Sequence, residues 1–204
     1  MASIEFVTVE AADPTAAERF YTTAFGLGDE VRSRASETPT TGFRGFTLSL
    51  VVSQPATVDG LVGAAVDAGA TTLKPAAKSL WGYGGVVRAP DGTICTVASS
   101  TKKNTGPDTR RIDELVLQLG VADVAASKRF YVDRGFAVEK SYGSRYVMFA
   151  APSSPVKLAL YRRRGLAKVA GVSPDGTGSH RLALGSDAGP FTDPDGFAWE
   201  PPSR

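Results

Sequence analysis

The side chains best able to do chemistry lie near the end of this 204-residue chain. Residues 191–200 have the sequence FTDPDGFAWE, which predicts a tight turn of proline, aspartate and glycine leading directly into a strand. Side chains alternate across a strand, so Ala198 and Glu200 face one side while Phe197 and Trp199 face the other. Glu200 is therefore a lone carboxylate on its strand face, where it could act as a general base or as a metal ligand.

Two other residues with reactive side chains occur once each. His180 is the sole histidine, and imidazole serves as an acid, a base or a metal ligand, although a lone histidine is also common as a hydrogen-bonded structural group. Cys95 is the sole cysteine and cannot form an internal disulfide, which favours a reducing compartment. A buried hydrophobic role for Cys95 is the simpler interpretation.

The elements that position these residues follow from the apolar pattern. Residues 4–9 predict a strand, and Asp13-Pro14 then predicts the start of a helix that ends at Gly26. Its apolar stripe comprises Ala17, Phe20, Tyr21, Ala24 and Phe25. Residues 46–52 predict another strand, and Pro55 opens a second helix whose inward positions are Val58, Leu61, Val62, Ala65 and Val66.

The second half of the chain repeats the first. The motif at 128–131, KRFY, matches ERFY at 18–21 with an offset of 110, and Asp123 matches Asp13 with the same offset. The turn phrase PDG occurs at 90–92 and again 104 residues later. Strands are predicted near 146–150 and 156–161, followed by a polar loop in which Arg162-Arg163-Arg164 forms a solvated turn. No second helix is predicted after His180, so the second half is a shortened copy.

The repeat divides the chain into a half at 1–98, a polar linker at 99–109 and a half at 110–204. The net charge of +2 is too small to indicate nucleic acid binding. No apolar run approaches the length of a membrane span, and the N-terminus has no basic leader-type region. We therefore expect a cytoplasmic protein that binds neither nucleic acid nor membrane.

These motifs, in this order, resemble the vicinal oxygen chelate superfamily of glyoxalases, bleomycin-resistance proteins and extradiol dioxygenases. The resemblance implies an α+β fold of tandem βαβββ modules, with two glyoxalase-like halves, cupped mixed sheets, and a second half that lacks one helix. It also assigns metal-ligand positions to the first strands, the module-opening strands and the closing strands. In this chain those positions hold Phe6 and Val116, Phe46 and His180, and Thr96 and Glu200.

Only His180 and Glu200 of that set could bind a metal, and water, Gln118 or Glu10 would have to complete the shell. The resemblance leaves two functions open. One is a protein that binds a small, flat molecule for sequestration or resistance, without a metal, in an apolar pocket lined by Trp81, Tyr83, Phe46, Tyr146 and Trp199. The other is a glyoxalase-like lyase or isomerase, or a ring-cleaving dioxygenase, that uses zinc, iron, nickel or manganese with Glu200 as the catalytic carboxylate.

We favour the binding protein because most ligand positions carry residues that cannot hold a metal. Two fused copies can supply within one chain the module pairing that shorter relatives obtain by dimerisation. We therefore expect a monomer or a weak homodimer whose partner is a small-molecule ligand.

Overall fold

The computed structural model describes residues 2–202, and it contains four α-helices and one short 3₁₀ helix within them. The helices are α1 (Pro14–Phe25), α2 (Pro55–Asp67), α3 (Val124–Val132), α4 (Arg163–Ala170) and η1 (Ser179–Arg181). The strands are β1 (Ile4–Ala11), β2 (Val31–Ala35), β3 (Thr41–Gly42), β4 (Phe46–Val51), β5 (Thr71–Ser79), β6 (Gly82–Arg88), β7 (Ile94–Ser99), β8 (Glu114–Val121), β9 (Val138–Ser141), β10 (Tyr146–Phe149), β11 (Val156–Arg162), β12 (Gly176–Thr177), β13 (Leu182–Ser186), β14 (Phe191–Thr192) and β15 (Ala198–Glu200). No described helix is long and apolar enough to cross a membrane.

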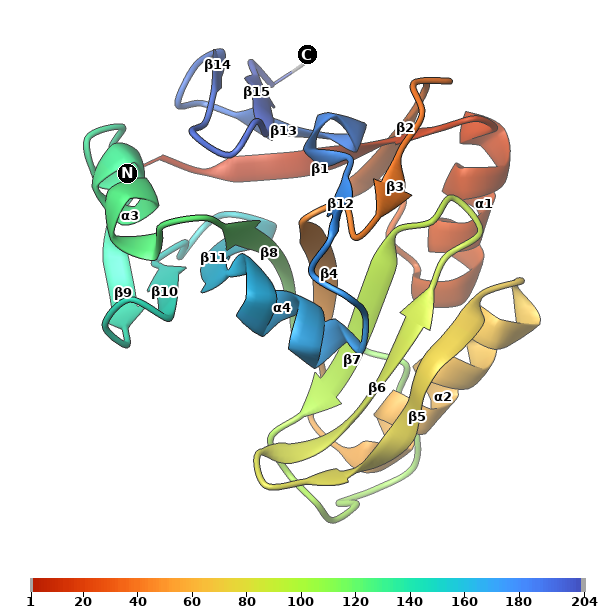
Figure 1. Ribbon diagram of the computed structural model, residues 1–204. Coiled ribbons are helices and arrows are strands. Elements are labelled where there is room, and N and C mark those ends of the chain that lie inside the picture. The colour runs from red at the N-terminus through yellow and green to blue at the C-terminus, as the bar shows by residue number, and fades with distance from the viewer. Residues whose placement is uncertain (1, 203–204) are drawn as a thin grey trace.

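The strands form a separate two-stranded sheet of β3 and β12 and one large sheet of thirteen strands. The large sheet divides into two parts, called here the inner sheet and the terminal sheet, that are joined at a single pair, Ile4 with Val156. The inner sheet has the order β9-β10-β11-β8-β4-β7-β6-β5, and the terminal sheet has the order β2-β1-β13-β15-β14. Both sheets mix parallel and antiparallel pairs. Figure 1 shows the terminal sheet across the top of the molecule and the inner sheet below it.

Strand register reveals how the two halves combine. In the inner sheet β4 runs antiparallel to β8, with Phe46 opposite Leu119. In the terminal sheet β13 runs antiparallel to β1, with Leu182 opposite Val9, which lies 110 residues before Leu119. Each sheet therefore takes strands from both halves of the sequence. Residues 100–113, which include most of the predicted linker, contain no helix or strand and separate the repeats in sequence.

This architecture confirms the predicted α+β fold with mixed sheets and a shortened second half. Each of the module-opening strands β4 and β13 leads to a parallel closing strand, β7 and β15 respectively. A helix, α2, lies between β4 and β7, whereas no helix lies between β13 and β15. The second half lacks that helix, as predicted.

Local signals set the helix ends. The side chain of Asp13 accepts a hydrogen bond from Ala16 N, and Asp123 caps α3 by accepting from Ala125 N at 2.8 Å. The predicted α1 stripe is buried throughout. In α2 the inward prediction was wrong for Val66, which is 43% exposed. Val66 lies eight residues after Val58, about 80° around the helix, and so falls at the edge of the buried stripe.

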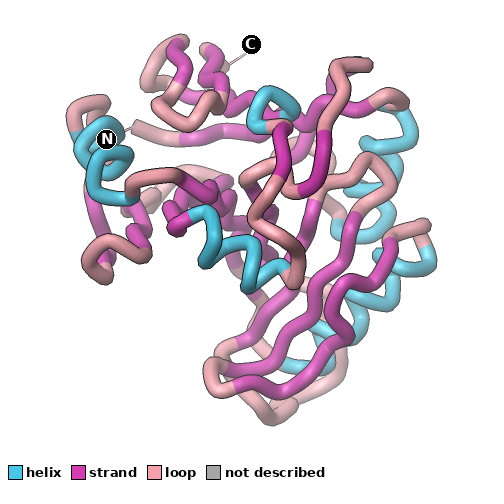
Figure 2. Tube along the Cα trace, viewed as in Figure 1, coloured by secondary structure: helices cyan, strands magenta, loops and turns pink. Residues whose placement is uncertain are grey.

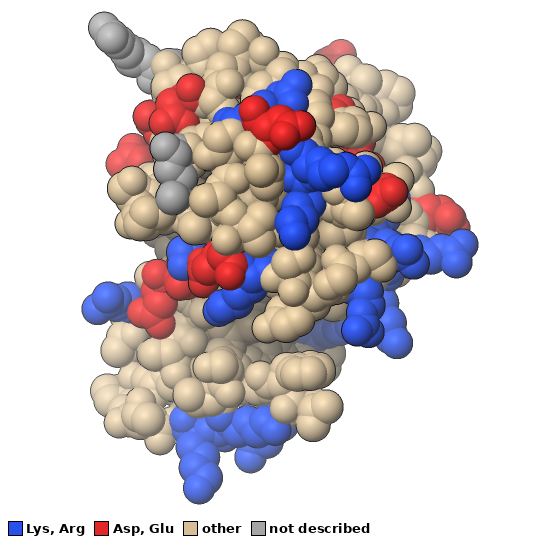
Figure 3. Space-filling model, turned by 90° about the vertical axis from the view of Figure 1, so that its left-hand side faces the viewer, with Lys and Arg blue, Asp and Glu red and all other residues tan. Residues whose placement is uncertain are grey.

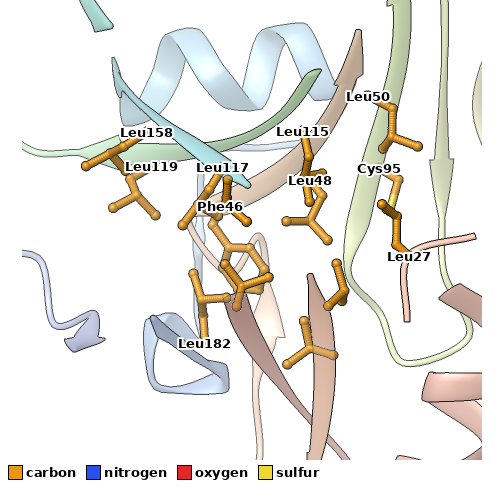
Figure 4. Close-up of a cluster of buried hydrophobic side chains, with 14 of the residues drawn as sticks. Leu27, Phe46, Leu48, Leu50, Cys95, Leu115, Leu117, Leu119, Leu158 and Leu182 are labelled. Carbon is orange, nitrogen blue, oxygen red and sulfur yellow. The ribbon is translucent and has the colours of Figure 1, made fainter. Parts of the chain in front are cut away.

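The hydrophobic core lies between the two sheets. Leu117 and Leu119 of β8 and Leu48 of β4 project from the inner sheet toward Leu182 of the terminal sheet, and all four are fully buried. Figure 4 shows these side chains on one side of β8, with α4 on the opposite side. The remaining parts of this core face pack against α1, α2 and α3.

Helix α4 was not predicted. Its residues were expected to form a polar loop that begins with a solvated turn at 162–164, and this prediction was wrong. Leu166, Ala167 and Ala170 are fully buried against Phe43 and neighbouring apolar residues. Figures 1 and 2 show α4 crossing β8 and β4, on the face of the inner sheet opposite the core. We call this face the α4 face.

Two features, one in the sheet and one in the helix, allow α4 to pack so closely. Gly120 of β8 lies under the helix, and a Cβ at this position would lie 3.2 Å from Arg163 Cα, so a larger side chain would push α4 away. The side chain of Arg163 is only partly exposed, and its guanidinium donates to Phe43 O, Pro174 O and Gly176 O. The charged group of Arg163 therefore binds the neighbouring backbone, since it donates to three carbonyl oxygens.

A buried tyrosine–aspartate hydrogen bond ties each repeat helix to its closing turn. Tyr21 Oη donates to Asp91 Oδ2 at 2.8 Å, and Tyr131, at the matching position of α3, donates to Asp193 Oδ2. Burial, with the neighbouring aspartate charge, raises the pKa of both tyrosines well above the ordinary value. Burial also raises the pKa of Asp193. These bonds are costly to break because they leave a desolvated carboxylate.

We predict that Tyr131→Phe lowers the free energy of unfolding by about 1–3 kcal/mol, because Asp193 loses a donor while it stays buried. The folded pKa of Asp193 is raised by burial, so its contribution to stability is lost as pH rises from the unfolded pKa of an aspartate through the folded pKa. The hydrogen bond from Tyr131 lowers the folded pKa, so the variant should lose stability over a wider pH range. Urea denaturation at several pH values measures both effects. Tyr142→Phe, at a side chain that is 62% exposed, is the control and should change stability little. Equal losses in the two variants would contradict the prediction.

Candidate functional site

Register places the candidate ligand positions in two rows, one across each sheet. In the terminal sheet Phe6 pairs with Gly185, and Gly185 pairs with Glu200. In the inner sheet Val116 pairs with Ser49, and Ser49 pairs with Thr96. The first-strand and closing-strand residues identified from the sequence therefore lie in the same row, with one strand between them.

The module-opening positions were assigned wrongly, because the residues that complete the rows are Ser49 and Gly185. Phe46 lies three residues earlier on β4 and its side chain is buried in the core. His180 lies in η1, outside any strand, and is exposed. It precedes Gly185 by five residues, which corresponds to roughly 16 Å of extended chain, so β13 does not carry His180 to Glu200.

Glu200 is held by an arginine. Arg34 of β2 donates from Nη1 to Glu200 Oε1 at 2.9 Å and from Nη2 to Glu10 Oε1 at 2.7 Å. The hydrogen bond to Glu10, followed by that to Glu200, raises the pKa of Arg34. A second arginine of β2, Arg32, places its guanidinium carbon 3.6 Å from the centre of the Phe6 ring. Both described contacts of this row are thus with arginines.

The five aromatic residues predicted to line a pocket do not converge. Trp81 is 85% exposed at the tip of the β5–β6 hairpin. Tyr83 lies on the core side, where its hydroxyl donates to Asp59 of α2 at 2.8 Å. Phe46 and Trp199 are core residues, so Tyr146 alone of the predicted set lies on the α4 face.

Sequence reasoning missed Tyr161, which accompanies Tyr146 there, and considered Gln118 only as a group that could complete a metal shell. Tyr161 of β11 packs edge-on against Tyr146 with ring centres 4.8 Å apart, and Tyr142 stacks on Tyr146 at 5.8 Å. Next to them Gln118 Oε1 accepts a hydrogen bond from Thr47 Oγ1 at 2.9 Å. The alternation of β8 and β11 predicts that Gln118 and Tyr161 share a face, but not that Tyr146 is their neighbour.

An open depression lies at one end of α4, where the parallel strands β8 and β11 finish. It has a volume of about 560 Å³. Its lining combines the end of β8, the first turn of α4 and the loop before β12: Val121, Ala122, Arg162, Arg163, Arg164, Pro174, Asp175 and Gly176. This volume falls in the range of small-molecule sites, although the lining is basic where the sequence predicted an apolar one.

No protein-family model and no curated protein matches the sequence. Solved structures do match the fold. Glyoxalase I from Zea mays superposes with a TM-score of 0.63 at 15% identity, covering 98% of this chain and 91% of that one. A Bacillus subtilis protein provisionally named a dioxygenase superposes with a TM-score of 0.53 at 12% identity, covering 89% of this chain and 69% of that one.

The chain has the vicinal oxygen chelate fold. Within this fold, the residues present do not fit a metal ion at either row. The inner row offers a valine and two hydroxyls, and the terminal row offers a phenylalanine, a glycine and one carboxylate that is bonded to Arg34. Residues 2–202 contain no group of three or more histidine, cysteine or acidic side chains that could hold a metal. Stable zinc sites use three or four protein ligands.

Arg34, Glu10 and Glu200 form a cluster of charges in this vicinal oxygen chelate fold. We expect the contribution of this cluster to the free energy of unfolding to depend on salt concentration. We predict that Arg34→Met lowers the free energy of unfolding by about 0.5–1 kcal/mol at low ionic strength, a modest figure because Arg34 is 45% exposed. The loss should shrink in concentrated salt, which screens exposed charges. Arg111→Met, which breaks a 3.5 Å pair at an 80% exposed side chain, is the matched control with a smaller effect. Salt-independent loss in urea denaturation would show that Arg34 acts by packing.

Proposed function

We propose that this chain binds a small, flat molecule on the α4 face of the inner sheet and that binding requires no metal. The observation that carries the proposal is the composition of the row Val116–Ser49–Thr96, which crosses the centre of this face. A valine and two small hydroxyl side chains, which are 2%, 6% and 6% exposed, stand there in place of metal ligands and supply hydrogen-bonding groups. Binding of this kind suits sequestration or resistance.

The three tyrosines supply the aromatic side of the proposed site. Tyr146 and Tyr161 are partly buried and Tyr142 is exposed, so the cluster presents ring surface at an accessible edge. Burial, followed by the proximity of Tyr161 and Glu139, raises the pKa of Tyr146. The hydroxyl of Tyr146 is therefore neutral at physiological pH, and its ring can stack on a flat ligand without a charge being desolvated.

Polar groups beside the tyrosines would orient the ligand. Because Gln118 Oε1 accepts from Thr47, the amide nitrogen of Gln118 remains able to donate to a ligand carbonyl or ring nitrogen. Ser49 and Thr96 add hydroxyls that are only slightly exposed. At the edge of the row Lys157 Nζ contacts Glu114 Oε1 at 2.6 Å, so these two charges neutralise each other.

Helix α4 defines one boundary of the proposed site. It covers the end of the face around Gly120 and packs near Tyr161. The covered end is filled by Leu166, Ala167 and Ala170, while the end that carries Ser49, Thr96 and Lys157 is left to the ligand. Such a half-covered face excludes water from one side of a flat molecule, which strengthens stacking and hydrogen bonds there.

We predict that Tyr146→Ala weakens binding of a flat aromatic ligand, found by screening a compound library, by about tenfold, because a stacked ring contributes on the order of 1 kcal/mol beyond its buried area. Trp81→Ala is the control and should leave the affinity unchanged, since Trp81 is exposed at a distant hairpin tip. Isothermal titration calorimetry measures both affinities. Loss of binding in Trp81→Ala with no change in Tyr146→Ala would place the site elsewhere.

We also predict that the purified protein carries no stoichiometric metal, because neither row offers three ligands. Elemental analysis of protein prepared without chelators tests this expectation. About one zinc, iron, nickel or manganese ion per chain, lost in Glu200→Gln or in His180→Ala, would favour a metal-dependent lyase or dioxygenase instead. Metal retained in both variants would point to ligands outside the two rows.

A further inference from the structure

A second site is indicated by an arginine whose charge has no described acid partner. Arg44, in the loop between β3 and β4, donates from Nη2 to the backbone Asp91 O at 2.7 Å. Its other terminal nitrogen, Nη1, is buried and has no acceptor within the described residues. A buried guanidinium nitrogen without an acceptor is costly, so its presence calls for a binding partner.

The surroundings of Arg44 add positive charge. Burial lowers the pKa of Arg44, and the positive charges of Arg181 and Arg88 lower it further. The negative charge of Asp91 acts in the opposite direction. Arg181 is itself 92% buried, since only 8% of its surface is exposed, and its Nε also has no acceptor in the described part of the chain. Within residues 2–202 none of these three arginines forms an ion pair.

The acid that faces this cluster is already engaged. Asp91 Oδ1 accepts from Thr93 N at 2.8 Å, and Asp91 Oδ2 accepts from Tyr21 Oη at 2.8 Å and from Thr93 Oγ1. Its carboxylate therefore serves the turn and α1, while Arg44 reaches only the carbonyl of the same residue. Three guanidinium groups share the attraction of one occupied carboxylate, which leaves a local excess of positive charge.

A small void lies beside Arg44. It is lined by Phe43, Arg44, Arg88, Gly92, Thr93 and Ile94, together with Gly42 and Phe46, and its volume is about 10 Å³. This volume is the space open to the centre of a water-sized sphere, so the void admits one water molecule or one monatomic ion. Gly92 approaches the guanidinium so closely that a Cβ would lie 2.7 Å from Arg44 Nη2, so the absence of a side chain there keeps the guanidinium in place.

We propose that this void is a binding site for a single small anion of chloride size, held by Arg44 and Arg88. The anion supplies the negative charge that the cluster lacks and accepts the hydrogen bond of Arg44 Nη1. It joins the loop before β4 to the turn between β6 and β7. The two arginines that hold the anion are not among the residues of the proposed ligand site on the α4 face, so either site can exist without the other.

The experiment compares sodium chloride with sodium gluconate at equal ionic strength, because gluconate is too large for the void. In the wild type, chloride should raise the thermal unfolding midpoint by a few degrees and the rise should saturate with concentration. Arg88→Met should abolish the rise without impairing folding, since the Arg88 side chain is exposed. Broadening of the chlorine NMR signal by the wild type, and its loss in Arg88→Met, gives a second readout.

Arg145→Met is the matched control, because Arg145 is an exposed arginine on the distant turn between β9 and β10, and it should retain the full response to chloride. Arg44→Met should also lose the response, although it removes the bond to Asp91 O and so lowers stability in either salt. Equal midpoints in chloride and gluconate, or the same chloride response in Arg88→Met and Arg145→Met, would overturn the proposal and assign the void to water.

Discussion

Two antiparallel strand pairs hold this molecule together, β4 with β8 and β1 with β13. Each pair joins the opening strand of a module in one half of the sequence to the first strand of the other half. Because side chains alternate along a strand, the register of these pairs decides which residues form the core and which form the outer rows. A shift of one residue would turn Gln118 and Thr47 toward the core and Leu117 and Leu48 toward the α4 face. The core and the candidate site therefore depend on the same two ladders.

Arginine side chains connect several loops and strands of this structure through hydrogen bonds and ion pairs. Arg163 holds three loop carbonyls, Arg181 donates to Glu10 O and Ser36 O, and Arg34 joins two glutamates. A planar guanidinium with five donors can bind several carbonyls at once, which lysine cannot do in the same geometry. Basic and acidic side chains are mixed over the upper and middle parts of the face in Figure 3.

Because of helix α4, the inner sheet does not have the open face that the fold by itself would predict. An open sheet face would have offered a wide pocket, whereas α4 fills one end with Leu166, Ala167 and Ala170 and leaves a basic depression at its start. The absence of a side chain at Gly120 makes this packing possible. Any ligand must therefore use the remaining part of the face, and its size and polarity are restricted accordingly.

The sequence by itself determined the local structure and the fold class. The caps at Asp13 and Asp123, the apolar stripe of α1 and the repeated turn phrase all follow from short-range chemistry, which acts in the same way wherever the segment lies. The repeat then limited the fold to paired modules. The separation of Trp199 from Glu200 across the strand also follows from alternation alone.

Only the tertiary structure decided which residues meet. The sequence placed His180 on a ligand-bearing strand, but the register makes Gly185 the third member of that row because β13 begins after η1. It also gave Trp81 and Tyr146 equal weight, although one lies at a hairpin tip and the other beside Tyr161. The arginines at 162–164 have the composition of a solvated turn, and α4 forms because Leu166, Ala167 and Ala170 find a glycine and apolar side chains on a sheet far away in sequence. Contacts of this kind depend on long-range register, which residue types and spacing within one segment do not encode.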